Sequence, residues 1–155
     1  MTKLNYILLF FLFVMVSCKV DKKFNKERWL ANNDVNDTHN PRAYMTEDLL
    51  KNHLRIGITR DSVFELLGKP YKDGIENRLP KGLKMPDSLS FSNKKNLKPE
   101  NSDRTTYRIN QFMRLNSQPD TLVLYPVGWS TIDPNFLVIK FDNKGVSSDF
   151  WIEQH

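Results

Sequence analysis

The spacing of apolar residues changes along this chain, and that change constrains the fold more than any other feature. Between residues 46 and 68 apolar residues recur three or four positions apart, which is the period of an amphipathic helix. From residue 107 onward they tend to alternate with polar residues, which is the period of a strand. Helices followed by strands are typical of an α+β domain. We therefore predict a two-helix hairpin packed on a three- to four-stranded antiparallel sheet.

The second of these helices has the clearest start and stop signals. Thr59 is a favourable N-cap, because its side-chain oxygen can accept a hydrogen bond from the first turn. An apolar stripe follows, and the helix ends at a glycine and a proline that stop it. The residues of the stripe and the stop are Val63, Leu66, Leu67, Gly68 and Pro70. The first helix is predicted to begin at Thr46, also as an N-cap.

The strands are predicted at 122–127, 136–141 and 146–152, with a tight turn around Gly145 between the last two. Residues 107–115 alternate less regularly, so the sequence leaves strand and helix open there. Residues 69–104 show no periodicity and contain four prolines. A stretch of this length is unusual for a plain loop. We therefore expect either an inserted loop at 69–104 or a short element hidden within it.

The N-terminal residues indicate export. Lys3 precedes ten apolar residues at 7–16, a length that suits a signal peptide and is too short for a bilayer span. The only cysteine, Cys18, follows directly after Ser17. This arrangement resembles a bacterial lipobox, in which the cysteine is acylated and the peptide before it is removed.

That interpretation divides the chain into three parts. Residues 1–17 are a signal peptide, 18–43 a lipidated tether, and 44–155 a single α+β domain with the 69–104 insertion. The anchor makes the membrane a partner. Lys19 follows the cysteine where inner-membrane lipoproteins of enteric bacteria carry aspartate, which favours the outer membrane. We expect the domain to face the periplasm rather than the cell surface.

Composition excludes several kinds of function. With one cysteine there is no internal disulfide and no zinc site built on cysteines. The histidines His39, His53 and His155 show no ligand spacing, and no nucleophile or phosphate-loop motif occurs. We therefore predict no catalytic residue, metal, cofactor or small-molecule substrate. Nucleic acid is an unsuitable partner for an exported chain.

Positive charge is concentrated in one segment. The chain has 23 basic and 18 acidic residues, and residues 69–104 hold nine of the basic and five of the acidic ones. A basic segment of this kind is either a solvated loop or a surface that rests on anionic lipid headgroups.

Residues 57–70 (GITRDSVFELLGKP) resemble the hallmark of the SmpA/OmlA (BamE-like) family of small outer-membrane lipoproteins. The shared positions are Gly57, Thr59, Val63, Leu66, Leu67, Gly68 and Pro70, which act structurally. Ile58 stands where the family usually has methionine, and the 69–104 segment is longer than the family's connection. The resemblance implies two helices on an antiparallel sheet, as in the repeat of β-lactamase-inhibitor protein.

The resemblance implies a membrane-anchored, non-catalytic interaction module for outer-membrane assembly or envelope integrity, with an envelope protein as partner. The alternative is an inhibitor or immunity-type lipoprotein that uses the same scaffold to block an enzyme. Aromatic residues are frequent anchors of protein interfaces. We therefore name Tyr125, Trp129 and Trp151 as a possible binding surface, with core packing as the alternative.

Overall fold

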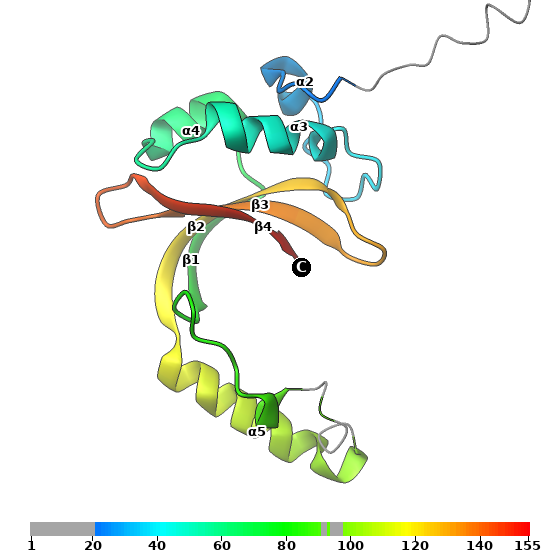
Figure 1. The fold of residues 1–155 in the computed structure, drawn as a ribbon, viewed down its shortest axis with the longest axis vertical. Coiled ribbons are helices and arrows are strands. Elements are labelled where there is room, and N and C mark those ends of the chain that lie inside the picture. Colours follow the sequence, from blue (N-terminus) through cyan, green and yellow to red (C-terminus); the bar gives the residue numbers. More distant parts are fainter. Residues whose placement is uncertain (1–20, 91–92, 94–97) are drawn as a thin grey trace, which may run out of the picture.

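The computed structural model describes residues 21–90, 93 and 98–155. The predicted signal peptide 1–17 and the lipidated Cys18 therefore lie outside the described residues. Figure 1 shows short helices on one side of a sheet and a longer helix beyond its opposite side. The elements are α2 (Lys26–Leu30), α3 (Arg42–Asp48), the π-helical turn η1 (Leu49–His53), α4 (Arg60–Leu67), β1 (Lys72–Arg78), the 3-10 turn η2 (Asp87–Leu89), α5 (Pro99–Asn116), β2 (Gln118–Trp129), β3 (Pro134–Phe141) and β4 (Ser147–Gln154).

The sheet has four antiparallel strands in the order β1-β2-β3-β4. The α+β class is confirmed, with a few short helices and a four-stranded antiparallel sheet. The strands predicted at 122–127, 136–141 and 146–152 correspond to β2, β3 and β4. Strands β2 and β3 are buried on both faces along most of their length, whereas β4 is partly exposed.

The first strand lies in a segment where the sequence left a loop or a hidden element open. Residues 69–104 contain β1, η2 and the start of α5, so they are not a plain loop. Residues 107–115, left open between strand and helix, belong to α5. Thr105 is buried and Ile109, Phe112 and Met113 are half-buried, a spacing of three or four residues that fits a helix. The partial alternation of apolar and polar residues at 107–115 therefore does not indicate a strand.

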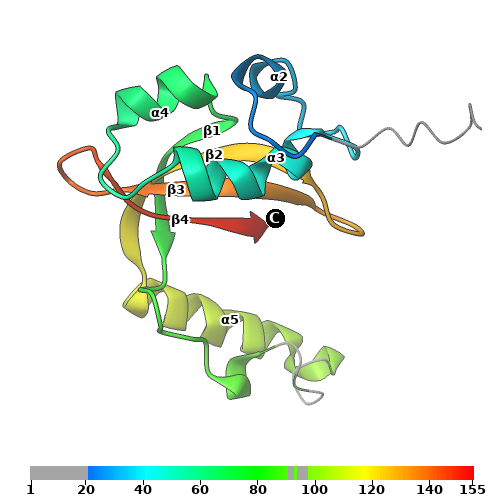
Figure 2. The same ribbon diagram turned by 45° about the horizontal axis from the view of Figure 1, so that its top comes forward.

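Helices α2, α3 and α4 cover one face of the sheet, as Figure 2 shows from a second direction. Between them and the strands lies the main apolar core. Its fully buried members include Trp29 from α2 and Met45 from α3, each 0% exposed. The other buried members are Leu49, Leu54, Val63, Leu67, Val123, Tyr125, Val127, Leu137, Ile139 and Phe141.

Two predictions about the N-terminal half are wrong. Helix α3 begins at Arg42, and Thr46 lies inside it, where its hydroxyl donates to the Arg42 carbonyl at 2.7 Å. The expected tether 18–43 is not separate from the domain, because Trp29 is part of the core and Phe24 packs against it. The segment is mainly polar, but these two aromatic residues are enough to hold it against the domain.

Helix α4 follows its sequence signals. The Thr59 side chain accepts a hydrogen bond from Ser62 N–H at 3.2 Å. Val63 and Leu67 are fully buried and Leu66 packs against the core. Gly68 ends the helix with φ +76°, and a Cβ there would lie 2.5 Å from the Leu30 side chain. The glycine is therefore required both for its backbone conformation and for the contact between α4 and α2.

The sheet is strongly curled. Arg78 at the end of β1 lies opposite Gln118, whereas Glu153 in β4 lies opposite Phe136, which lies opposite Pro126. In a flat sheet these two rows would be about 26 Å apart along the strands. The Arg78 and Glu153 side chains are nevertheless in contact. The paired strands β1 and β2 therefore bend away from the helices and over the far face of β3 and β4, and α5 projects beyond them (Figure 1).

Candidate functional site: the concave face of the sheet

Strand alternation places one set of side chains on the side of the sheet that lacks helices. The paired positions Lys72, Leu124, Val138 and Trp151 cross all four strands on this side. Every second residue along each strand from these positions shares the same side. We call it the concave face; its members are Lys72, Gly74, Glu76, Arg78, Asp120, Leu122, Leu124, Phe136, Val138, Lys140, Asp149, Trp151 and Glu153.

The centre of the concave face is a small apolar cluster separate from the main core. Leu122, Leu124, Phe136 and Val138 are buried there, and Trp151 packs against them while staying partly exposed. Val35, from the connection between α2 and α3, also packs against the cluster. The rings of Tyr71 and His155 contact Phe136.

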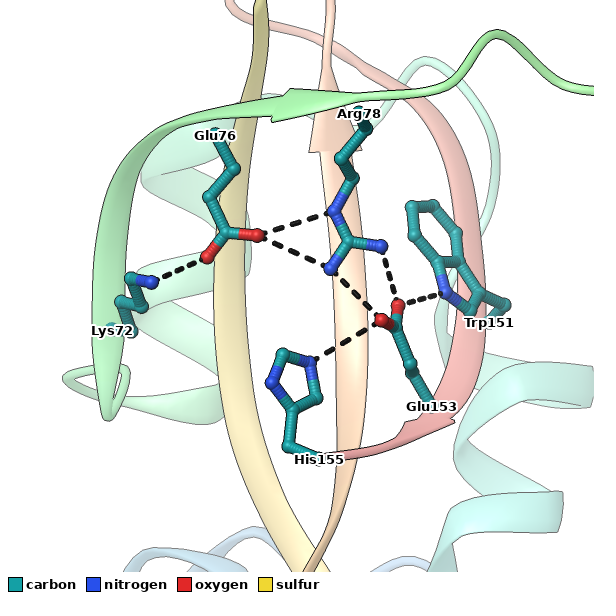
Figure 3. Close-up of polar contacts among 6 residues, drawn as sticks. All are labelled: Lys72, Glu76, Arg78, Trp151, Glu153 and His155. Carbon is teal, nitrogen blue, oxygen red and sulfur yellow. Dashed lines mark hydrogen bonds and ion pairs between the residues drawn. The ribbon is translucent and has the colours of Figure 1, made fainter. Parts of the chain in front are cut away.

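Charged side chains form a chain of contacts above this cluster, drawn in Figure 3. Lys72 Nζ lies 2.6 Å from Glu76 Oε1, and Glu76 Oε2 accepts from Arg78 Nε at 3.2 Å. Arg78 then donates from both terminal nitrogens to Glu153, at 2.6 and 3.0 Å. This two-pronged pair is the geometry in which arginine binds a carboxylate most strongly. It joins the two edge strands of the sheet.

Trp151 and His155 complete the surroundings of Glu153. The Trp151 Nε1–H donates to Glu153 Oε2 at 2.8 Å, and the Arg78 guanidinium lies 5.6 Å from the centre of the indole ring. His155 Nε2 lies 3.5 Å from Glu153 Oε1, and its ring meets Phe136 edge-on. Glu153 thus receives contacts from three side chains, which fixes its orientation.

These contacts shift the ionisation of both glutamates. Burial alone would raise the pKa of Glu153, but hydrogen bonds from Arg78 and Trp151 outweigh it and hold the pKa below its ordinary value. The contact with Lys72 is the main cause that lowers the pKa of Glu76, with Arg78 adding to it. Both carboxylates are therefore ionised at neutral pH, so neither is suited to act as a general acid.

Two further ion pairs lie at the rim. Lys140 Nζ lies 2.6 Å from Asp120 Oδ1, between β3 and β2. Lys81, just beyond β1, donates to Asp149 in β4 at 2.6 Å. This second pair also joins the end of β1 to the opposite edge of the sheet, but the Lys81 side chain is almost fully exposed.

The concave face contains a hollow of about 660 Å³. Its lining includes Trp151 and Phe150 from β4 and Met113 from α5. Each of the seven charged residues that line it takes part in an ion pair. Those residues are Glu76, Arg78, Lys81, Asp120, Lys140, Asp149 and Glu153.

The charged groups of the hollow are engaged with one another. Within residues 21–90, 93 and 98–155, no group of three or more His, Cys, Asp or Glu is placed to hold a metal ion. The carboxylates of the hollow are engaged by cations rather than aimed at a hydroxyl or thiol. The Trp151 side chain stays partly exposed beside these charged groups, which can form ion pairs with a partner in place of those within the chain. Such a surface fits a protein partner that carries both signs of charge.

The three aromatics predicted as a binding surface do not gather in one place. Tyr125 is wrong as a surface residue: it is fully buried on the helical side, and its hydroxyl donates to the Gly68 carbonyl at 2.9 Å. Trp129 is half-buried, and its indole N–H donates to the Val35 carbonyl at 2.7 Å. Trp151 alone lies on the concave face.

The motif at 57–70 joins the helical layer to the β3–β4 turn. Gly57 has φ +87°, and its N–H donates to Ser147 O at 2.8 Å. Thr59 forms a β-bridge with Val146, and Pro70 is buried just before β1. These contacts are internal, so the motif positions secondary structure and contributes nothing to the concave face.

Sequence reasoning did not find the Arg78–Glu153 pair. The two residues are 75 positions apart, and Arg78 lies in a segment where no strand was identified. No local pattern links them. Only the curl of the sheet brings them together.

Comparison with known proteins gave no match: no family model, curated protein or solved structure matches the chain. Among the helices that the structure describes, none is both long and apolar enough to cross a bilayer.

Proposed function

We propose that this chain is a lipid-anchored, non-catalytic interaction module of the bacterial envelope whose concave face binds a protein partner. One observation carries the proposal: helices cover one face of the sheet, while the other holds a hollow lined by Trp151 and seven paired charges. A partner that inserts charged groups there would exchange ion pairs without leaving a charge unpaired. Its aromatic contact would be Trp151.

The cellular context of the proposal comes from the N-terminal sequence. Acylation at Cys18 would hold the domain on a membrane, since a doubly acylated protein dissociates very slowly. Lys19 after the cysteine supports the outer membrane, with the domain on the periplasmic side. The partner is then an envelope protein, and outer-membrane assembly or envelope integrity is the process served.

The finer fold and the family are part of the same proposal. A helical hairpin made of α3–η1 and α4, lying over the meander β2–β3–β4, supports the SmpA/OmlA (BamE-like) arrangement. The additional strand β1 and the projecting α5 extend that arrangement. They would be the part of this chain that is specific to its own partner.

Crosslinking of the intact lipoprotein in detergent-solubilised envelopes, with mass spectrometry of the neighbours, tests the proposal. We expect one envelope protein whose crosslinks cluster around Trp151 and are lost in Trp151→Ala. Ile132→Ala is a matched control, because Ile132 is an exposed apolar residue in the β2–β3 turn and outside the hollow. Loss of the neighbour in the control alone, or retention in Trp151→Ala, would contradict the assignment of the concave face.

An inhibitor or immunity-type lipoprotein is the second candidate, and α5 is the observation that favours it. The helix projects from the body, and Tyr107 and Leu115 on it are 68% and 70% exposed. An exposed helix of this kind can enter a cleft of an enzyme. A single soluble enzyme as the dominant neighbour, crosslinked to α5, would support this reading over envelope assembly.

A further inference from the structure

We infer that the helical side of the domain lies against the bilayer, so that the concave face and α5 point away from the membrane. The inference rests on the proposed lipid anchor at Cys18 and adds an orientation to it. The lipid surface is thus a second partner, bound by a different side of the domain from the protein partner.

The folded domain begins close to the anchored residue. Phe24 N–H donates to Asp48 Oδ2 at 2.8 Å, and the Phe24 ring lies 5.8 Å from Trp29 and 4.9 Å from His53 between centroids. From Phe24 onward the chain is therefore fixed to the helical layer. Six residue steps separate Cys18 from Phe24. A fully extended chain covers about 3.5 Å per residue, so the layer is held within about 20 Å of the acylated cysteine.

That connection is short compared with the domain. Strand β2 has 12 residues, which corresponds to about 40 Å of strand. Figure 2 shows the first described residues beside α2, whereas α5 lies at the far end of the molecule. A domain attached by so short a connection cannot bring α5 to the membrane without placing its whole length across the surface. The helical layer is the side that reaches the lipid first.

The side chains around the attachment point also suit an anionic lipid surface. Lys22, Lys23 and Lys51 line a shallow hollow there together with Glu47 and Asp48. All three lysines are exposed. None of them pairs with a carboxylate among the residues that the structure describes. Glu47 and Asp48 add two negative charges to the same hollow, so the three lysines leave it with a small positive excess. Such lysines bind anionic headgroups.

The orientation can be measured by depth-dependent quenching on the full lipoprotein. The purified protein is reconstituted into phosphatidylethanolamine–phosphatidylglycerol vesicles whose headgroups carry a nitroxide. Acylation would consume the Cys18 thiol, the only one in the chain, so a single introduced cysteine can be labelled with a fluorophore. We expect strong quenching at Lys51→Cys and none at Tyr107→Cys. Equal quenching at both sites, or stronger quenching at residue 107, would overturn the orientation.

Vesicle flotation separates this inference from the proposed function. A protein that floats with the vesicles but shows no contrast between the two sites retains the lipid anchor and loses the orientation. A protein that does not float overturns the anchor, and the orientation with it. Inserting about 20 Gly and Ser residues after Lys19 adds a reach of about 25 Å. This extended variant should still float with weaker quenching at residue 51, because only the lysines then hold the helical side near the lipid. Unchanged quenching would contradict the tether argument.

Discussion

The two faces of the sheet are formed by the same strands, but they are covered in different ways. On the helical face, fully buried residues such as Trp29, Val63 and Leu137 form one continuous apolar core. On the concave face, a cluster of four buried residues lies beneath a layer of ion pairs and a hollow. Burial of apolar area is the dominant source of stability, whereas partly exposed ion pairs contribute little. The comparison teaches that stability resides mainly on the helical face, leaving the concave face free to change contacts on binding.

Removal of a large core side chain is the strongest test of that division. Trp29→Ala should reduce the free energy of unfolding by about 3–5 kcal/mol, because a fully buried indole is replaced by a cavity. Trp151→Ala should cost much less, about 1 kcal/mol, because Trp151 is only partly buried. Urea unfolding of the mature domain measures both. Equal losses for the two tryptophans would remove the difference between the faces.

A charged side chain buried deep under the helices, Arg42, gives the next largest effect. Arg42 is 1% exposed, and burial lowers its pKa to about 10, with only a small opposing effect from Tyr125. Its Nε donates to the Trp29 carbonyl at 2.8 Å and its guanidinium lies 4.5 Å from the centre of the Trp29 ring. It also reaches the Pro126 carbonyl, so it joins α2 to β2.

Arg42→Ala should therefore cost about 2–4 kcal/mol, since it leaves buried carbonyls without a donor and opens a cavity. Arg42→Met keeps most of the packing against Trp29 and should cost about half as much. Both are measured by urea unfolding at neutral pH. An alanine variant as stable as the parent chain would show that the segment 25–43 does not need this link to the sheet.

The difference between the faces also explains what the sequence could predict. Helix α4 and strands β2–β4 were predicted because each carries a local signal, such as the Thr59 cap or the apolar run at 136–141. The role of Trp29 was missed because α2 is only five residues long and lies in a polar segment. The sequence makes a helical turn at 25–30 plausible, but a helix this short does not show which residue docks.

The concave face could not be predicted, because its contacts join residues far apart in the chain. Strand β1 contains Gly74 and several charged residues, which are uncommon in strands and masked it. Some of its charges pair within the strand, as Lys72 does with Glu76, and others pair with a distant strand, as Arg78 does with Glu153. Trp151 was identified as a candidate from its residue type alone. Tyr125 was named for the same reason but lies on the opposite face. Residue type alone does not determine on which face of a sheet a side chain lies.

Acidification should weaken the concave face. Because the pKa of folded-state Glu153 lies below its ordinary value of 4.5, its contribution to stability is complete above that pH. It is lost as the pH falls through the lower, folded-state pKa. Glu153→Gln should lose about 1 kcal/mol at neutral pH, in the range of partly exposed ion pairs. Glu153 faces Arg78, His155 and Trp151, and Glu76 faces Lys72 and Arg78.

The measurement is urea unfolding of the parent chain and of Glu153→Gln across an acid pH series. The gap between the two proteins should narrow on acidification, since protonated Glu153 can no longer form the pair. Other carboxylates with a lowered pKa, including Asp48 and Asp149, are present in both proteins and cancel in the difference. A gap that stays constant with pH would mean that the amide changes packing rather than charge.

The smallest effect should come from the rim, where a contact with the same topology lies in water. The Lys81–Asp149 pair joins the end of β1 to β4, as the Arg78–Glu153 pair does. The difference is exposure: the Lys81 side chain is 87% exposed and that of Arg78 is 21% exposed. Lys81→Ala should therefore change the free energy of unfolding by less than about 0.5 kcal/mol, whereas Arg78→Ala should cost clearly more. Equal costs in urea unfolding would mean that the strength of these pairs depends on joining β1 to β4 and not on how far each pair is removed from water.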